Sequence, residues 1–89
     1  MSLHLDFVSF KNILNKYNIK LFDSQFRIAH FRYNNFIKTI PQTGGSGIHR
    51  PDYIIRKINK QSNHLLYHFI DSLIYNNLTK ATFIIDSLV

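Results

Sequence analysis

The segment HLLYHFIDSLIYN, residues 64–76, has the widest apolar face of the sequence, because only Asp71, Ser72 and two histidines interrupt its apolar residues before it ends in asparagine. Side chains three and four positions apart share one helix face, so the segment predicts a helix that is apolar around most of its circumference. Such a helix lies at the centre of a core or faces a partner. The residues expected at a partner interface are Leu66, Phe69, Ile70, Leu73 and Ile74.

Residues that favour capping mark both ends of this helix. Ser62 and Asn63 either cap a new helix or continue inside one longer helix. Asn76 and Asn77 end it, because asparagine tolerates the left-handed backbone conformation. Thr79 is then expected to cap a last helix, with the apolar stripe Leu78, Ala81, Ile85 and Leu88.

The first half of the chain shows helical spacing twice. Apolar residues follow steps of four and three positions over residues 3–21 and again over residues 22–40. Each set forms a stripe on one face of a helix, and that stripe can be buried. We expect Asp23 and Ser24 to cap the second helix and Pro41 to close it.

A competing interpretation places strands at residues 26–28 and 36–40, around a turn at Asn34 and Asn35. Alternation of apolar and polar residues extends over only a few positions there. Helix is therefore favoured over strand in this region.

All three glycines of the chain fall in the run GGSG, residues 44–47. The run resembles a flexible spacer, either engineered in place of a native loop or native to the chain. A phosphate-binding loop is disfavoured, because Ile48 and His49 follow the run where such a loop has lysine and serine or threonine. The run divides the chain into residues 1–43 and 48–89.

These segments predict a single all-α domain over residues 1–89. We expect a small bundle of four to five short helices, arranged as two helical hairpins joined by the glycine-rich loop. Pro51 and Asp52 would begin the helix that follows the loop. The expected core residues are Phe7, Phe10, Leu14, Phe26, Tyr33, Phe36, Leu66, Phe69, Leu73, Ile74 and Ile85.

The composition excludes several classes of function. The 89 residues include no cysteine, which excludes disulfides, thiolate catalysis and zinc–thiolate sites. Five scattered aspartates, with no glutamate and no Ser-His-Asp pattern, give no catalytic set, so we expect no enzyme activity, no cofactor and no small-molecule substrate. The sequence has neither a long apolar run nor a secretory signal, and we expect a cytoplasmic protein without membrane attachment.

The whole chain has a net charge of +6, and its positive charge is concentrated in one part of the sequence. Residues 11–60 hold ten of the eleven lysines and arginines with only Asp23 and Asp52, so they carry +8, whereas residues 61–89 carry −1. Such asymmetry is typical of proteins that bind polyanions. The alternative interpretation is that these charges form a solvated face that keeps the domain soluble. The expected nucleic-acid contacts are Arg27, Arg32, Arg50, Arg56, Lys57 and Lys60.

Two helices would carry most of these contacts. Arg56, Lys57 and Lys60 fall on one side of a helix and would contact phosphates. Arg27 and Arg32 belong to a polar strip with neighbouring histidine and asparagine side chains. Asparagine and arginine read bases in a major groove, but every amphipathic helix also needs a polar outer face.

The last segment, LTKATFIIDSLV (residues 78–89), resembles the recognition helix of winged helix-turn-helix regulators, since a small, polar first turn precedes an apolar half. The resemblance implies that this segment would enter a DNA groove. Asn76 and Asn77 depart from the pattern, because they stand where a small and an apolar residue are expected before the turn.

Histidines at positions 64 and 68 have the spacing that a divalent ion can bridge on a helix. The nearest acid in the sequence is Asp71, and two imidazoles alone make a weak site. We therefore expect no metal site, and His64 and His68 are interpreted as a hydrogen-bonded or interface pair.

The sequence leaves two functions open. The first is a small basic protein that binds nucleic acid or modulates transcription through its lysine and arginine face. The alternative is a protein–protein interaction module (an adaptor, a secretion chaperone or a phage- or plasmid-type inhibitor) that uses the wide apolar helix. That helix also leads us to expect a homodimer or a larger protein partner.

Overall fold

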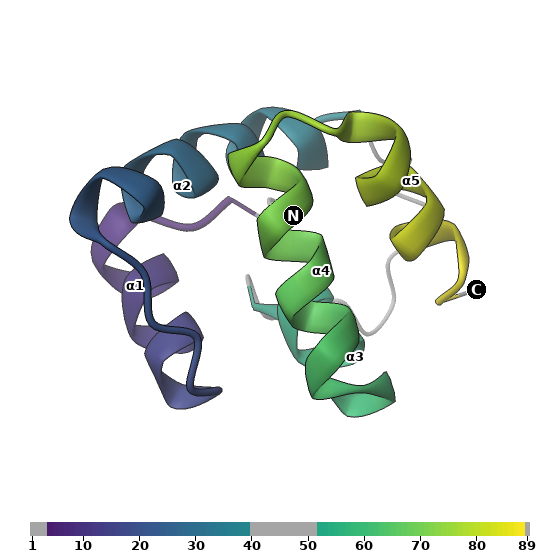
Figure 1. Cartoon of the computed structure of the whole chain (residues 1–89), viewed down its shortest axis with the longest axis horizontal. Coiled ribbons are helices and arrows are strands. Elements are labelled where there is room, and N and C mark those ends of the chain that lie inside the picture. The colour runs from purple at the N-terminus through teal and green to yellow at the C-terminus, as the bar shows by residue number, and fades with distance from the viewer. Residues whose placement is uncertain (1–3, 40–51, 89) are drawn as a thin grey trace.

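The computed structural model describes residues 4–39 and 52–88, and these contain five helices and no strand (Figure 1). The all-α prediction is confirmed. The competing interpretation is wrong, because residues 26–28, the expected turn at Asn34 and Asn35, and residues 36 and 37 of the second expected strand all lie inside one helix. The helices are α1 (Phe7–Lys16), α2 (Asp23–Ile37), α3 (Tyr53–Gln61), α4 (Asn63–Ile74) and α5 (Leu78–Asp86).

Several predicted features lie outside the described residues. They are the glycine run at residues 44–47, the helix stop at Pro41, the helix start at Pro51 and the candidate contact Arg50.

Helix α4 lies at the centre of the fold. It contacts α2, α3 and α5, while α1 packs against α2 (Figure 1). Three neighbouring helices therefore surround α4, and its wide apolar circumference is what this position requires.

The core follows the predicted apolar stripes closely. The Phe10 and Tyr33 rings join α1 to α2 at a centroid distance of 5.4 Å, and Phe36 meets Phe69 of α4 at 6.0 Å. Burial, with a smaller contribution from the charge of Asp52, raises the pKa of the Tyr33 hydroxyl above its ordinary value. All the predicted core residues are buried except three that are partly buried and pack against the core, namely Phe7, Ile74 and Ile85.

Helix α1 is shorter than its apolar stripe predicts. It ends at Lys16, because Asn18 takes the left-handed conformation with φ 65°, and the expected continuation to Leu21 is wrong. At the other end Asp6 caps the helix, and its Oδ1 accepts a hydrogen bond of 2.7 Å from the Ser9 N–H. This bond lowers the pKa of the Asp6 carboxyl.

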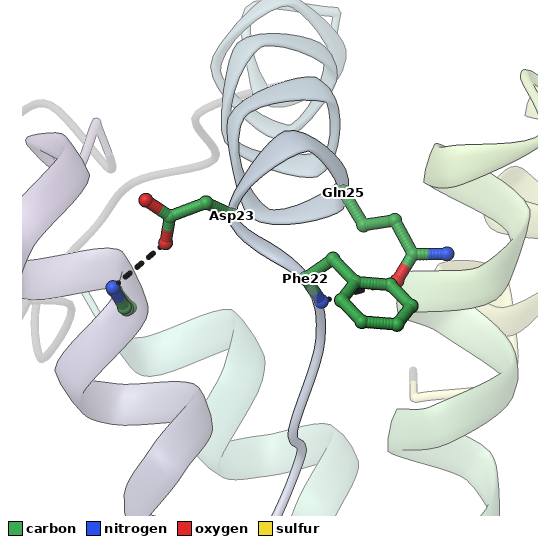
Figure 2. Close-up of polar contacts among 4 residues, drawn as sticks. Phe22, Asp23 and Gln25 are labelled. Carbon is green, nitrogen blue, oxygen red and sulfur yellow. Dashed lines mark hydrogen bonds and ion pairs between the residues drawn. The ribbon is translucent and has the colours of Figure 1, made fainter.

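The start of α2 also differs from the prediction. Phe22, rather than Asp23 or Ser24, is the cap residue. The Gln25 Oε1 reaches back to accept from the Phe22 N–H at 3.2 Å (Figure 2). The Asp23 carboxylate instead accepts from Lys11 Nζ at 2.9 Å, which ties the start of α2 to α1.

Both ends of α4 lie where the sequence predicts them, whereas the start of α5 does not have the predicted cap. Ser62 is extended and its hydroxyl accepts from the N–H two residues later at 3.1 Å, so α3 and α4 are separate helices. Asn76 takes the expected left-handed conformation with φ 56°. The predicted cap at Thr79 is wrong, because the Asn77 Oδ1 accepts from the Lys80 N–H at 3.2 Å and caps α5.

Candidate nucleic-acid interface

Helix α3 turns its isoleucines to the core and its cations to the surface. The isoleucines are buried, Arg56 and Lys57 are half-buried, and Lys60 is exposed. These three cations and Tyr53 stand three or four positions apart, and such residues share one helix face. They line a surface hollow of about 400 Å³, here named the basic hollow and defined by Tyr53, Arg56, Lys57 and Lys60.

Tyr53 positions one of these cations. The Lys57 Nζ donates a hydrogen bond of 3.1 Å to the Tyr53 hydroxyl and lies 5.4 Å from the centroid of its ring. The ring is itself packed against the core, so it provides a fixed partner for a mobile lysine side chain. In the sequence Tyr53 stands out only as an apolar residue, although its spacing from Lys57 already places both on one face.

The charges of the basic hollow are not neutralised by nearby acids. Among residues 4–39 and 52–88, the ion pair joins Lys11 to Asp23, with Nζ and Oδ1 2.9 Å apart, and no carboxylate pairs with the cations of α3. The hydrogen bond from Lys11, aided by its positive charge, lowers the pKa of the Asp23 carboxyl. Lys11 therefore has an acidic partner, while the three cations of the basic hollow have none among the described residues.

Arg32, a predicted nucleic-acid contact, has an internal partner instead. Its Nη1 donates to the carbonyl oxygens of Leu73 and Ile74 at 2.9 and 2.6 Å. These carbonyls lie in the last turn of α4, where a helix has no donors of its own to offer them. The half-buried Arg32 therefore caps α4 through its Nη1, and its contact with a phosphate stays a prediction.

Arg27 is the other predicted contact on α2. Its side chain is exposed, and its guanidinium carbon lies 4.9 Å from the centroid of the Phe7 ring. It does not line the basic hollow. The structure therefore brings together Arg56, Lys57 and Lys60 and leaves Arg27 outside that site.

Two more members of the polar strip on α2 hold the segment that precedes α1. The Asn34 Oδ1 accepts from the Leu5 N–H at 3.1 Å, and its Nδ2 donates to the Leu5 carbonyl at 3.0 Å. The His30 Nε2 lies 2.6 Å from the same carbonyl oxygen. The same ring nitrogen also lies 3.1 Å from the Asn34 Nδ2. These groups are occupied within the fold and are not free to read bases.

The residues predicted to face a partner lie inside the chain's own core. Ile74 is partly buried. The other four are at most 1% exposed, namely Leu66, Phe69, Ile70 and Leu73. Their helix contacts α2, α3 and α5, so these four side chains have no surface to offer a partner in this structure.

Helix α5 exposes an apolar surface that the sequence did not predict. Phe83 is 76% exposed and Leu78 is 46% exposed, although Leu78 was expected on the buried stripe. Two threonines also line the hollow beside them, and Asp86 is the charged residue among its described lining. A helix that enters a DNA groove needs donors and cations on that face. The described lining of this hollow has threonine hydroxyls as donors but no cation, so it fits the helix-turn-helix resemblance only in part.

His64 and His68 are both exposed on α4. Within the described part of the chain, no group of three histidine, cysteine, aspartate or glutamate side chains is placed to hold a metal ion.

None of the described helices has the length and apolar character to cross a bilayer.

A scan against protein-family models, a search of curated proteins and a search of solved structures each gave no match for this chain.

Proposed function

We propose that the protein is a non-enzymatic nucleic-acid-binding protein that holds the phosphate backbone in the basic hollow. The observation that carries this proposal is that three cations without an acidic partner line one hollow of about 400 Å³, which no acid of the described residues lines. A concave cationic surface concentrates phosphate near it more strongly than the same charges dispersed over a sphere.

The expected binding mode follows from the residue types. Arg56 offers a planar guanidinium that can bind one phosphate through two hydrogen bonds, while Lys57 and Lys60 act as point charges. Contacts of this kind position a protein on nucleic acid without reading its sequence. We therefore expect single-stranded and double-stranded DNA and RNA to bind with similar and strongly salt-dependent affinity.

The experiment measures fluorescence anisotropy of labelled DNA and RNA oligonucleotides against protein concentration at several salt concentrations. Three phosphate contacts give a slope of log K against log salt of about −2 to −3. The double variant Arg56→Glu/Lys57→Glu is expected to weaken binding at low salt on the order of 100-fold.

The matched control makes the same change in net charge elsewhere. Lys16 and Lys20 are exposed near the end of α1 and do not line the basic hollow, so Lys16→Glu/Lys20→Glu should weaken binding far less. Undetectable binding at low salt, binding that is insensitive to salt, or equal losses in the two double variants would each contradict the proposal.

A second candidate is a protein–protein interaction module, and one observation favours it. Phe22, Tyr67 and Tyr75 are 80, 55 and 71% exposed, and both tyrosines line a hollow of about 150 Å³ between α4 and the segment that precedes α2. Exposed aromatic rings are enriched at protein interfaces. Under this alternative, complexes isolated from a native lysate survive nuclease and high salt and are lost in Tyr67→Ala/Tyr75→Ala, while the oligonucleotides do not bind.

A further inference from the structure

The surface between α2 and α5 contrasts with the basic hollow. Two neighbouring hollows of about 310 and 450 Å³ share Leu78 and Thr82, so they form one continuous surface. Phe31 of α2 lines the first hollow and is 65% exposed, and Phe83 of α5 lines the second and is 76% exposed. We name this the α2–α5 surface and define it by Phe31, Leu78, Thr82 and Phe83.

The described lining of the α2–α5 surface has no net charge. Among the described residues, the charged side chains that line its two hollows are Arg32 and Asp86, and their charges are opposite. The Nη1 of Arg32 is already bonded to the carbonyls at the end of α4. This neutral lining belongs to a chain whose net charge is +6. Nucleic acid would therefore find much less positive charge here than at the basic hollow.

We propose that this surface is where a second copy of the chain binds, in a dimer with two-fold symmetry. Two molecules of charge +6 repel each other, and the repulsion is smallest when the faces that approach carry no net charge, as the described lining of this surface does. A two-fold interface also needs one patch that fits itself. The α2–α5 surface meets this need, because the protruding Phe83 ring lies beside a hollow that the Phe83 ring of a second copy can enter.

The exposed area indicates how strong the dimer is. Aromatic side chains bury about 150–250 Å² each, so the exposed parts of Phe31 and Phe83 would bury roughly 200–350 Å² per copy. A standard interface buries about 800 Å² per partner. The two rings alone would therefore supply roughly a quarter to less than half of a standard interface. We expect a weak dimer whose dissociation constant is in the micromolar range or above.

The dimer is independent of the proposed function but would extend it. Because the α2–α5 surface and the basic hollow share no described lining residue, each basic hollow keeps its charge in the dimer. Two linked hollows could bind one long oligonucleotide more tightly than either alone.

The test is sedimentation velocity from about 10 µM to about 1 mM protein, a range that covers weak dimers. The wild-type chain is expected to shift from monomer to dimer over this range. Phe83→Glu, which places a charge in the contact at a position already exposed to water, should remain monomeric with an unchanged circular dichroism spectrum and melting temperature.

Phe22→Glu is the matched control, because Phe22 is equally exposed at the start of α2 and does not line either hollow. This variant should dimerise as the wild type does. A wild-type monomer at the highest concentration, a dimer that Phe83→Glu leaves intact, or one that Phe22→Glu weakens equally would overturn the proposal.

Discussion

Helices α2 and α3 carry similar polar side chains and use them in opposite ways. On α2, Arg32 and Asn34 bind backbone groups of α4 and of the segment before α1, and the Asp23 carboxylate is paired with Lys11. On α3, the three cations are not paired with any acid among the described residues, and they line a hollow together. One helix therefore uses its polar groups to hold the fold, and the other leaves them available for a ligand.

This difference matters because net charge does not distinguish a cation that stabilises the fold from one that can bind a ligand. Arg32 and Arg56 are equivalent in any count of residues. Their roles differ because Arg32 reaches carbonyls at the end of α4, which have no donor within that helix, whereas Arg56 lines an open hollow. Substitutions on the two helices should therefore have different consequences.

The largest expected effect on stability is at Arg32. Arg32→Ala leaves the Ile74 carbonyl without its donor and the Leu73 carbonyl with only the 3.3 Å bond from the Asn76 N–H. We expect a loss of about 1.5–2 kcal/mol, the lower part of the range for a bond to a charged group. Arg56→Ala should change stability by less than about 0.5 kcal/mol, as most surface substitutions do. Urea unfolding followed by circular dichroism measures both, and equal losses would erase the distinction between the helices.

A smaller effect is expected at Asn34. Asn34→Ala removes both bonds to the backbone of Leu5, and a loss of about 1 kcal/mol is expected, together with faster hydrogen exchange of the Leu5 amide. The neighbouring Asn35 is exposed, so Asn35→Ala serves as the control and should leave that exchange rate unchanged. Unaltered exchange at Leu5 in Asn34→Ala would show that the segment before α1 is held by other contacts.

The smallest effect concerns the Lys11–Asp23 pair. The Lys11 bond lowers the pKa of the Asp23 carboxyl below its ordinary 3.8, so the pair stabilises the fold above that pH. This contribution is lost as the pH falls through the lowered pKa of the folded chain. An NMR titration should show a lowered value in the wild type and a return toward 3.8 in Lys11→Met. An Asp23 titration that is the same in both proteins would contradict the pairing.

The sequence predicted the core better than it predicted the helix ends and the site. Phe10, Tyr33 and Phe69 follow a spacing that any buried helix face must have, so periodicity alone identifies them. The end of α1 depends on the backbone conformation of Asn18, which interrupts an apolar stripe that continues past it.

The candidate site was predicted only in part, because spacing along the sequence does not show which of the predicted polar side chains bond to other helices of the fold. Arg56, Lys57 and Lys60 share one helix, and their spacing was enough to group them. The role of Arg32 depends on where α4 ends in space, 41 positions further along the chain. The exposure of Phe83 depends on which side of α5 meets α4, and the apolar spacing of α5 leaves more than one side possible.

The two connections α1–α2 and α4–α5 both turn on asparagine in the left-handed conformation, at Asn18 and Asn76. All three glycines of the chain lie at residues 44–47, so neither turn uses one. Glycine would fit these backbone angles with less steric cost, but it allows the unfolded chain many more conformations. With asparagine at both turns, the unfolded chain has less conformational entropy to lose when the helices form, which helps a chain of only 89 residues to fold.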